Sequence, residues 1–82
     1  MPTVDAFDGK RVVIYPNDHR PAHVHVIGNG REAVFKLNCP GGPPEVRENY
    51  GFSSGDLAKI KSALAERRAQ LCAAWSKIHG NP

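Results

Sequence analysis

The sequence of 82 residues has no apolar run close to the roughly 18 residues that a membrane-spanning helix needs. Its first nine residues, MPTVDAFDG, contain neither the basic segment nor the apolar stretch of a secretion signal. We therefore expect a cytoplasmic protein with no membrane partner.

Cysteine is scarce. Cys39 and Cys72 are the two cysteines, and they lie far apart, one in a loop rich in proline and glycine and the other in an expected helix. Two such cysteines form neither the disulfide framework of a small secreted domain nor a C-x-x-C metal pair. The sequence therefore predicts two free thiols.

Charge of one sign is present only in modest excess. The formal net charge is +3 and the sequence pI is about 9.1, with the basic residues scattered along the chain. This excess favours an acidic partner such as nucleic acid or an acidic protein, but does not by itself predict nucleic-acid binding. A chain this short buries only about 60–65% of its unfolded surface, so we expect one domain, residues 1–82, with one sheet packed on one helix.

Alternating apolar residues, separated by turn signals such as Asp8-Gly9, predict strands. The fold class we predict is α+β: a small antiparallel β-meander of three to five strands packed against one long C-terminal helix. The expected strands are Thr3–Phe7, Arg11–Tyr15, His23–Ile27, Arg31–Leu37 and a short edge strand, Glu45–Tyr50.

The predicted helix runs from Asp56 to His79, about 36 Å at 1.5 Å per residue. Ser53 or Ser54 can cap its first turn, and Gly80 can end it. Apolar residues recur on one face at 3.6-residue spacing: Leu57, Ile60, Leu64, Leu71, Trp75 and Ile78.

Arg68 interrupts this apolar face, because at 100° per residue it lies about 20° from Leu57 and Trp75. A guanidinium held partly out of water needs an acceptor. We predict a bidentate ion pair between Arg68 and Asp18.

The most distinctive stretch is NDHRPAHVHV, residues 17–26, which holds three of the four histidines. His23 and His25 alternate with two valines, so on a strand both imidazoles project from one face about 6.6 Å apart. The valines face the core, and the histidines are expected to be accessible. Pro21 favours a turn that folds His19 over the same face.

Three interpretations of this cluster stay open. His19, His23 and His25 can ligate zinc or another divalent metal and leave a fourth position open, as in catalytic sites. Without metal, two of the histidines can serve as general base and general acid, with Asp18 in the binding site and Arg20 or Arg68 holding an RNA phosphate. In the third interpretation the histidines only cover the sheet and cap a turn.

The chain resembles a family of small bacterial proteins known as domain of unknown function 4160. The resemblance rests on the opening MPTV, on the D-H-x-P-x-H-x-H-V core and on R-x-x-L-x-x-x-W at Arg68, Leu71 and Trp75. Two positions depart from the family pattern, which commonly has proline in place of Ala22 and often histidine in place of Arg67. The resemblance implies a compact α+β fold, and a gene beside that of another small protein in an arrangement suggestive of a toxin–antitoxin pair. The family motif falls on Asp18, His19, Pro21, His23, His25, Arg68 and Trp75.

We therefore expect a toxin-like member of a toxin–antitoxin-type pair, with a small protein partner encoded nearby. Its histidine cluster would act on phosphate or RNA, or bind a divalent metal such as zinc. The alternative is a non-catalytic protein-interaction or metal-binding module. Growth during induced expression, with and without the neighbouring gene, separates the two.

Overall fold

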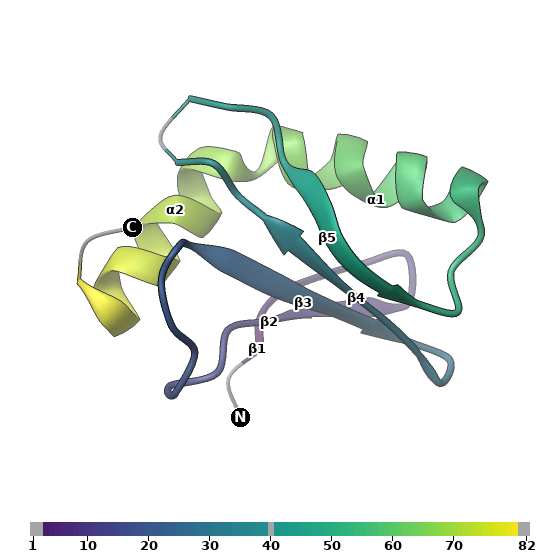
Figure 1. Cartoon of the computed structure of the whole chain (residues 1–82), viewed down its shortest axis with the longest axis horizontal. Helices are drawn as coiled ribbons and strands as arrows, with labels where there is room; N and C mark the ends of the chain where they lie inside the picture. Colours follow the sequence, from purple (N-terminus) through teal and green to yellow (C-terminus); the bar gives the residue numbers. More distant parts are fainter. Residues whose placement is uncertain (1–2, 40, 81–82) are drawn as a thin grey trace.

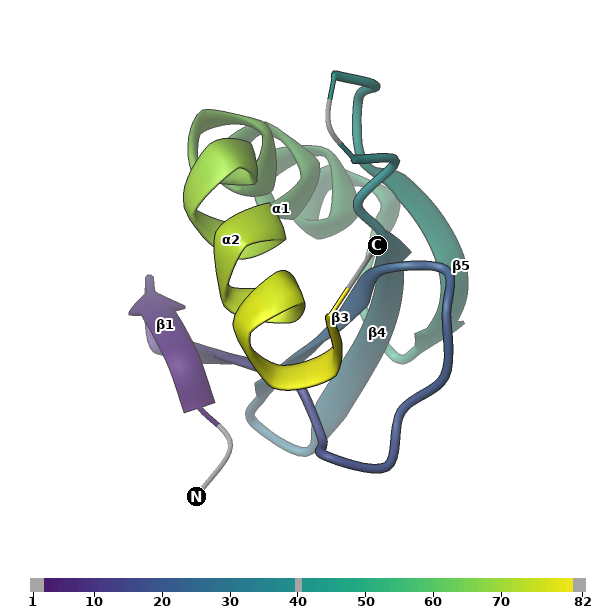
Figure 2. The ribbon, with the colours of Figure 1, turned by 90° about the vertical axis from the view of Figure 1, so that its left-hand side faces the viewer.

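The computed structural model describes residues 3–39 and 41–80, which form one five-stranded sheet and two helices. The strands are antiparallel and follow chain order: β1 (Thr3–Phe7), β2 (Lys10–Val13), β3 (His23–Gly28), β4 (Arg31–Lys36) and β5 (Glu45–Tyr50). The helices α1 (Ser54–Glu66) and α2 (Arg68–His79) cover one face of this sheet (Figures 1 and 2). The predicted α+β class and the antiparallel meander, expected to have three to five strands, are confirmed. Within the described residues neither helix has the length and apolar character needed to span a membrane.

The hydrophobic core lies between this sheet and the helices, where strand alternation places it. Val24 is paired with Phe35 and Val26 with Ala33 across β3 and β4, and all four are at most 1% exposed. The helices contribute Ile60, Leu64, Leu71 and Trp75 to the same cluster. The prediction that the valines of the histidine strand face the core is therefore confirmed.

Two hairpin turns carry the residues that their geometry requires. Asp8 and Gly9 have φ values of 49° and 73°, and Asn29 and Gly30 have φ values of 50° and 73°. Positive φ at both central residues is the mark of a type I′ turn, whose twist matches that of the flanking strands. These turns fix the registers of β1 with β2 and of β3 with β4.

The prediction of one continuous helix is wrong at Arg67, where φ is −106° and ψ is 8°. A straight helix over residues 56–79 would be about 36 Å long, whereas the longest extent of the molecule is 32 Å. The break lets α2 change direction and pass along the end of the sheet (Figure 2). Within α2, Leu71 and Trp75 are buried, whereas Ile78, predicted to lie on the same face, is 40% exposed.

Arg67 anchors the break to the first strand. Its Nε lies 3.0 Å from Asp5 Oδ2, and its guanidinium lies over the Phe7 ring, 4.8 Å from the centroid. Its terminal nitrogen also donates to the Ala63 carbonyl at 3.0 Å. The residue that ends α1 therefore connects the helical layer to an edge strand.

We expect Arg67→Ala to lower the free energy of unfolding by about 1–3 kcal/mol, since it removes an ion pair with Asp5 and a hydrogen bond to the Ala63 carbonyl from a partly buried site. Urea denaturation of the single variants Arg67→Ala and Asp5→Ala and of the double variant measures the coupling energy between the two side chains. A coupling energy near zero would contradict the anchoring role.

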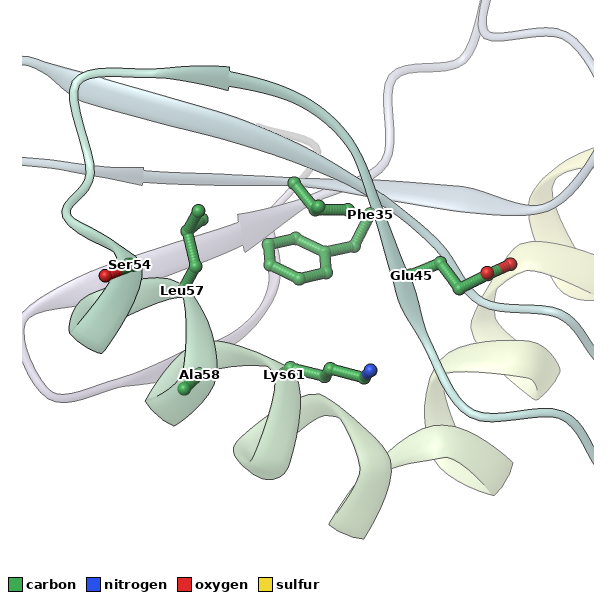
Figure 3. Close-up of a pocket in the computed structure, with 7 residues that line it drawn as sticks. Phe35, Glu45, Ser54, Leu57, Ala58 and Lys61 are labelled. Atoms are coloured by element: carbon green, nitrogen blue, oxygen red, sulfur yellow. The ribbon is translucent and has the colours of Figure 1, made fainter.

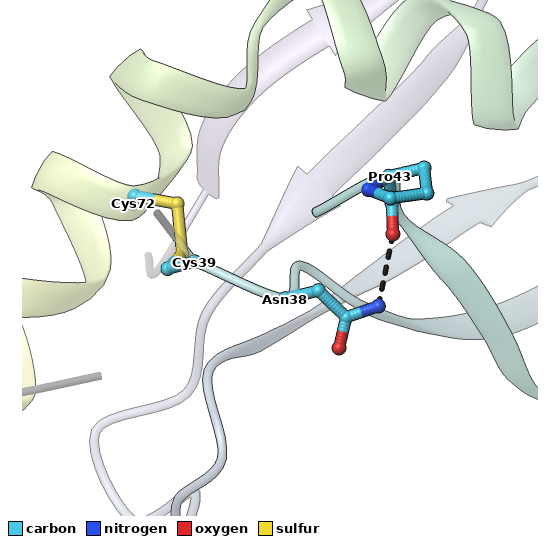
Figure 4. The surroundings of a disulfide bond; sticks show 4 residues. All are labelled: Asn38, Cys39, Pro43 and Cys72. Carbon is cyan, nitrogen blue, oxygen red and sulfur yellow. Dashed lines mark hydrogen bonds between the residues drawn. A yellow bond between two sulfur atoms is a disulfide. The ribbon is translucent and has the colours of Figure 1, made fainter. Parts of the chain in front are cut away.

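The prediction of free thiols is also wrong, because Cys39 and Cys72 form a disulfide (Figure 4). They are 33 residues apart in sequence, but the meander and the returning helix bring their Cα atoms to 6.0 Å. This separation is within the usual range for a disulfide. The bond joins the loop after β4 to α2, and Asn38 orders the same loop by donating to the Pro43 carbonyl at 2.9 Å.

Candidate metal centre

The connection between β2 and β3, residues 14–22, shapes the histidine region. The Asp18 N–H donates to the Tyr15 carbonyl at 3.0 Å, and the Tyr15 N–H donates to Asp18 Oδ2 at 2.9 Å. The peptide bond between Arg20 and Pro21 is cis. This ordered turn, as predicted, is not helical, and it holds the Asp18 carboxylate beside the first residues of β3.

Three potential metal ligands meet there. Asp18, His23 and His25 each offer one ligand atom, and these atoms lie within 4.8 Å of one another. The His25 Nε2 is 3.3 Å from either Asp18 oxygen, and the His23 Nε2 is 3.6 Å from Oδ1. The arrangement brings two imidazoles and one carboxylate to a common point.

The other nitrogen of each ring has its own acceptor. His23 Nδ1 lies 2.8 Å from the Pro21 carbonyl, and His25 Nδ1 lies 3.1 Å from Glu32 Oε2. A carbonyl and a carboxylate accept hydrogen bonds, so each Nδ1 carries a proton, and in a neutral ring each Nε2 carries a lone pair. Two lone pairs and a carboxylate then face one another, an arrangement that a cation between them, a proton or a metal ion, makes favourable.

The histidines are less accessible than the alternation predicted. His23 is 5% exposed, and its ring lies 5.2 Å from the ring of Trp75. His25 is half-buried, with the Tyr15 ring edge-on at 4.8 Å. The expectation of accessible histidines is wrong for His23 because α2 and residues 14–22 fold around the end of the sheet.

A pocket of about 230 Å³ lies over this group. His19 and Arg20 line it from the connection, and Arg47 and Glu48 line it from β5. The remaining lining residues are Asn17, Asp18, His23, His25 and Val34. The Tyr50 hydroxyl donates to Glu48 Oε1 at 2.5 Å, and this hydrogen bond, together with the charge of Glu48, raises the pKa of Tyr50. Among the residues that line the pocket, Asn17, Arg20 and Arg47 carry side-chain hydrogen-bond donors.

The residues predicted to form the site divide into two sets. Asp18, His23 and His25 converge, whereas His19 and Arg20 are exposed and line the pocket outside the three-ligand group. Arg68 is half-buried in the first turn of α2. Asp18 forms ion pairs with His23 and His25, and the ion pair of Asp18 with Arg68 stays a prediction.

Two contributors were not predicted. Glu32 orients His25 from the neighbouring strand, and His79 Nε2 donates to the Tyr15 carbonyl at 3.0 Å. The His79 ring also lies 4.2 Å from that of Trp75. Glu32 could have been found from the pairing of β3 with β4, but no sequence signal connects His79 with Tyr15, 64 residues earlier.

A second hollow of about 400 Å³ lies between β5 and α1 (Figure 3). Phe35, Val46 and Leu57 make its lining largely apolar, and its ionisable residues are Glu45 and Lys61. One acid and one amine do not make a set of metal ligands. The chemistry therefore assigns the candidate site to the smaller pocket over the histidines.

The model of the domain of unknown function DUF4160 matches residues 9–76. The chain belongs to this family. No curated protein and no solved structure matches it. The part of this DUF4160 protein that matches the family contains all three converging ligands and both cysteines, whereas β1 and His79 lie outside it.

Proposed function

We propose that this DUF4160 protein binds a divalent metal ion, zinc in the first instance, through Asp18, His23 and His25. The observation that carries the proposal is the convergence of both Nε2 atoms on one carboxylate while each Nδ1 is held by an acceptor. Partners of this kind fix the tautomer of metal-ligating histidines in metalloproteins. Two histidines, one carboxylate and an open position form a donor set of catalytic zinc sites.

The substrate we propose is a phosphodiester, with RNA as the first choice. The open side of the ligand group faces the pocket, where Arg20 and Arg47 can donate to phosphate oxygens and His19 can transfer a proton. A bound metal ion would polarise a phosphoryl oxygen or activate water. The basic sequence pI of about 9.1 suits an anionic substrate.

The family resemblance supports a further part of the proposal, a toxin-like role in the cytoplasm that a small protein encoded nearby neutralises. Arrest of growth on induced expression, relieved by the neighbouring gene, is the phenotype that this role requires. Unchanged growth of the cells on induced expression would instead favour the non-catalytic module.

Calorimetric titration with zinc, followed by incubation with an RNA oligonucleotide, tests the site and its chemistry separately. We expect one zinc ion to bind with micromolar or better affinity and the loaded protein to cleave RNA. The His23→Ala/His25→Ala variant should do neither. Absence of binding rejects the metal site, and binding without cleavage of RNA leaves a non-catalytic metal-binding module.

A further inference from the structure

The Cys39–Cys72 disulfide attaches α2 to the rest of the fold at the end of the sheet that holds the histidines. It joins the loop after β4 to the first half of α2 (Figure 4). Both cysteines are half-buried, so the disulfide is not completely shielded from solvent. The helix that it anchors begins after the break at Arg67, and α2 therefore is not held in place by continuous hydrogen bonding from α1.

The same helix contacts the metal ligands. Trp75, three residues after Cys72, packs on His23 at 5.2 Å, and His79, one turn further, donates to the Tyr15 carbonyl. Tyr15 in turn donates its N–H to Asp18, and its ring packs on His25. All three ligands thus touch α2 directly or through Tyr15.

We infer that the Cys39–Cys72 disulfide is a redox switch for this site: its reduction releases α2 and weakens metal binding. In a reducing compartment such as the proposed cytoplasm, disulfides are rare, and those that occur are usually transient and redox-sensing. The inference rests on the proposed metal site, and its test separates failure of the switch from failure of that site.

A dithiol can reduce the disulfide, and the atoms and electrons of this exchange balance. One thiolate of the dithiol attacks a cysteine sulfur, and the S–S bond breaks through a mixed disulfide. The second thiol then displaces the remaining cysteine, so the protein gains two electrons and two protons as two thiols and the dithiol becomes a disulfide. Without the cross-link the helix loses its covalent attachment to the loop, and only its non-covalent contacts then hold it against the sheet.

Trp75 reports on the switch because it is the single tryptophan and lies against His23. We expect reduction with a phosphine to shift its fluorescence emission to longer wavelength as α2 moves away from the sheet, with far-UV circular dichroism confirming that the fold persists. The Cys39→Ser/Cys72→Ser variant, which has no thiols to bind zinc themselves, should bind zinc at least about tenfold more weakly than the oxidised protein, as for loss of groups that orient ligands.

The variant Ala73→Ser, at an exposed neighbouring position of α2, is the matched control and should behave as the parent does. An unchanged Trp75 emission on reduction, or equal zinc affinity of the double serine variant and the oxidised protein, overturns the switch alone. If the oxidised protein binds no zinc at all, the proposed metal site fails and the switch fails with it.

Discussion

Asp18→Ala should weaken zinc binding by at least about a hundredfold, whereas His19→Ala should change it by less than about threefold. Loss of groups that only orient ligands costs about 10–100-fold in metal affinity, and Asp18 is one of the three converging ligands itself. His19 lines the pocket but lies outside that group. The two variants change adjacent residues of one turn, so they form a matched pair.

Competition with a chromophoric chelator measures both dissociation constants on the same scale. If His19→Ala loses zinc and Asp18→Ala retains it, the ligand set is the three histidines that the sequence pattern predicted. If both variants bind as the parent does, the metal ion is held elsewhere.

Trp75→Ala should lower the free energy of unfolding by about 3–5 kcal/mol, the usual cost of removing a buried tryptophan side chain. Trp75 is fully buried and joins the core to His23 and His79. Because small domains have only about 5–15 kcal/mol of stability, this change should remove a large part of the stability of the fold. Urea denaturation followed by circular dichroism measures it.

Ile78→Ala, on the same helix, is the control. Ile78 is 40% exposed, and its truncation should cost less than about 1 kcal/mol. Equal losses for the two variants would mean that Ile78 is buried on the same apolar face as Trp75, as the sequence predicted, and would contradict the exposure of Ile78 in the structure.

The sheet could be predicted from sequence because its determinants are local. Alternation on β3 and β4 assigns the valines to the core, and the two turns with positive φ fix the neighbouring registers. The helix break could not, because no glycine or proline marks Arg67. Its cause is tertiary: the side chain of Arg67 is bound to Asp5 and Phe7.

The candidate site was predictable only in part, because some of its contacts join residues that are far apart in sequence. The H-x-H spacing places His23 and His25 side by side, and the turn before β3 supplies Asp18 from nearby in sequence. By contrast, the burial of His23 depends on Trp75, which only the path of α2 brings to the sheet. The disulfide could not be predicted, because the spacing of two cysteines in the sequence does not show whether they are close in space.

The contact between His79 and the Tyr15 carbonyl, which are 64 residues apart in sequence, has a consequence for synthesis. The meander pairs each strand with the next, so a chain emerging from the ribosome can form its hairpins in order. The turn that carries Asp18 still lacks Trp75 and His79 at that stage. We therefore expect the ligand group to reach its final geometry only after α2 has left the exit tunnel.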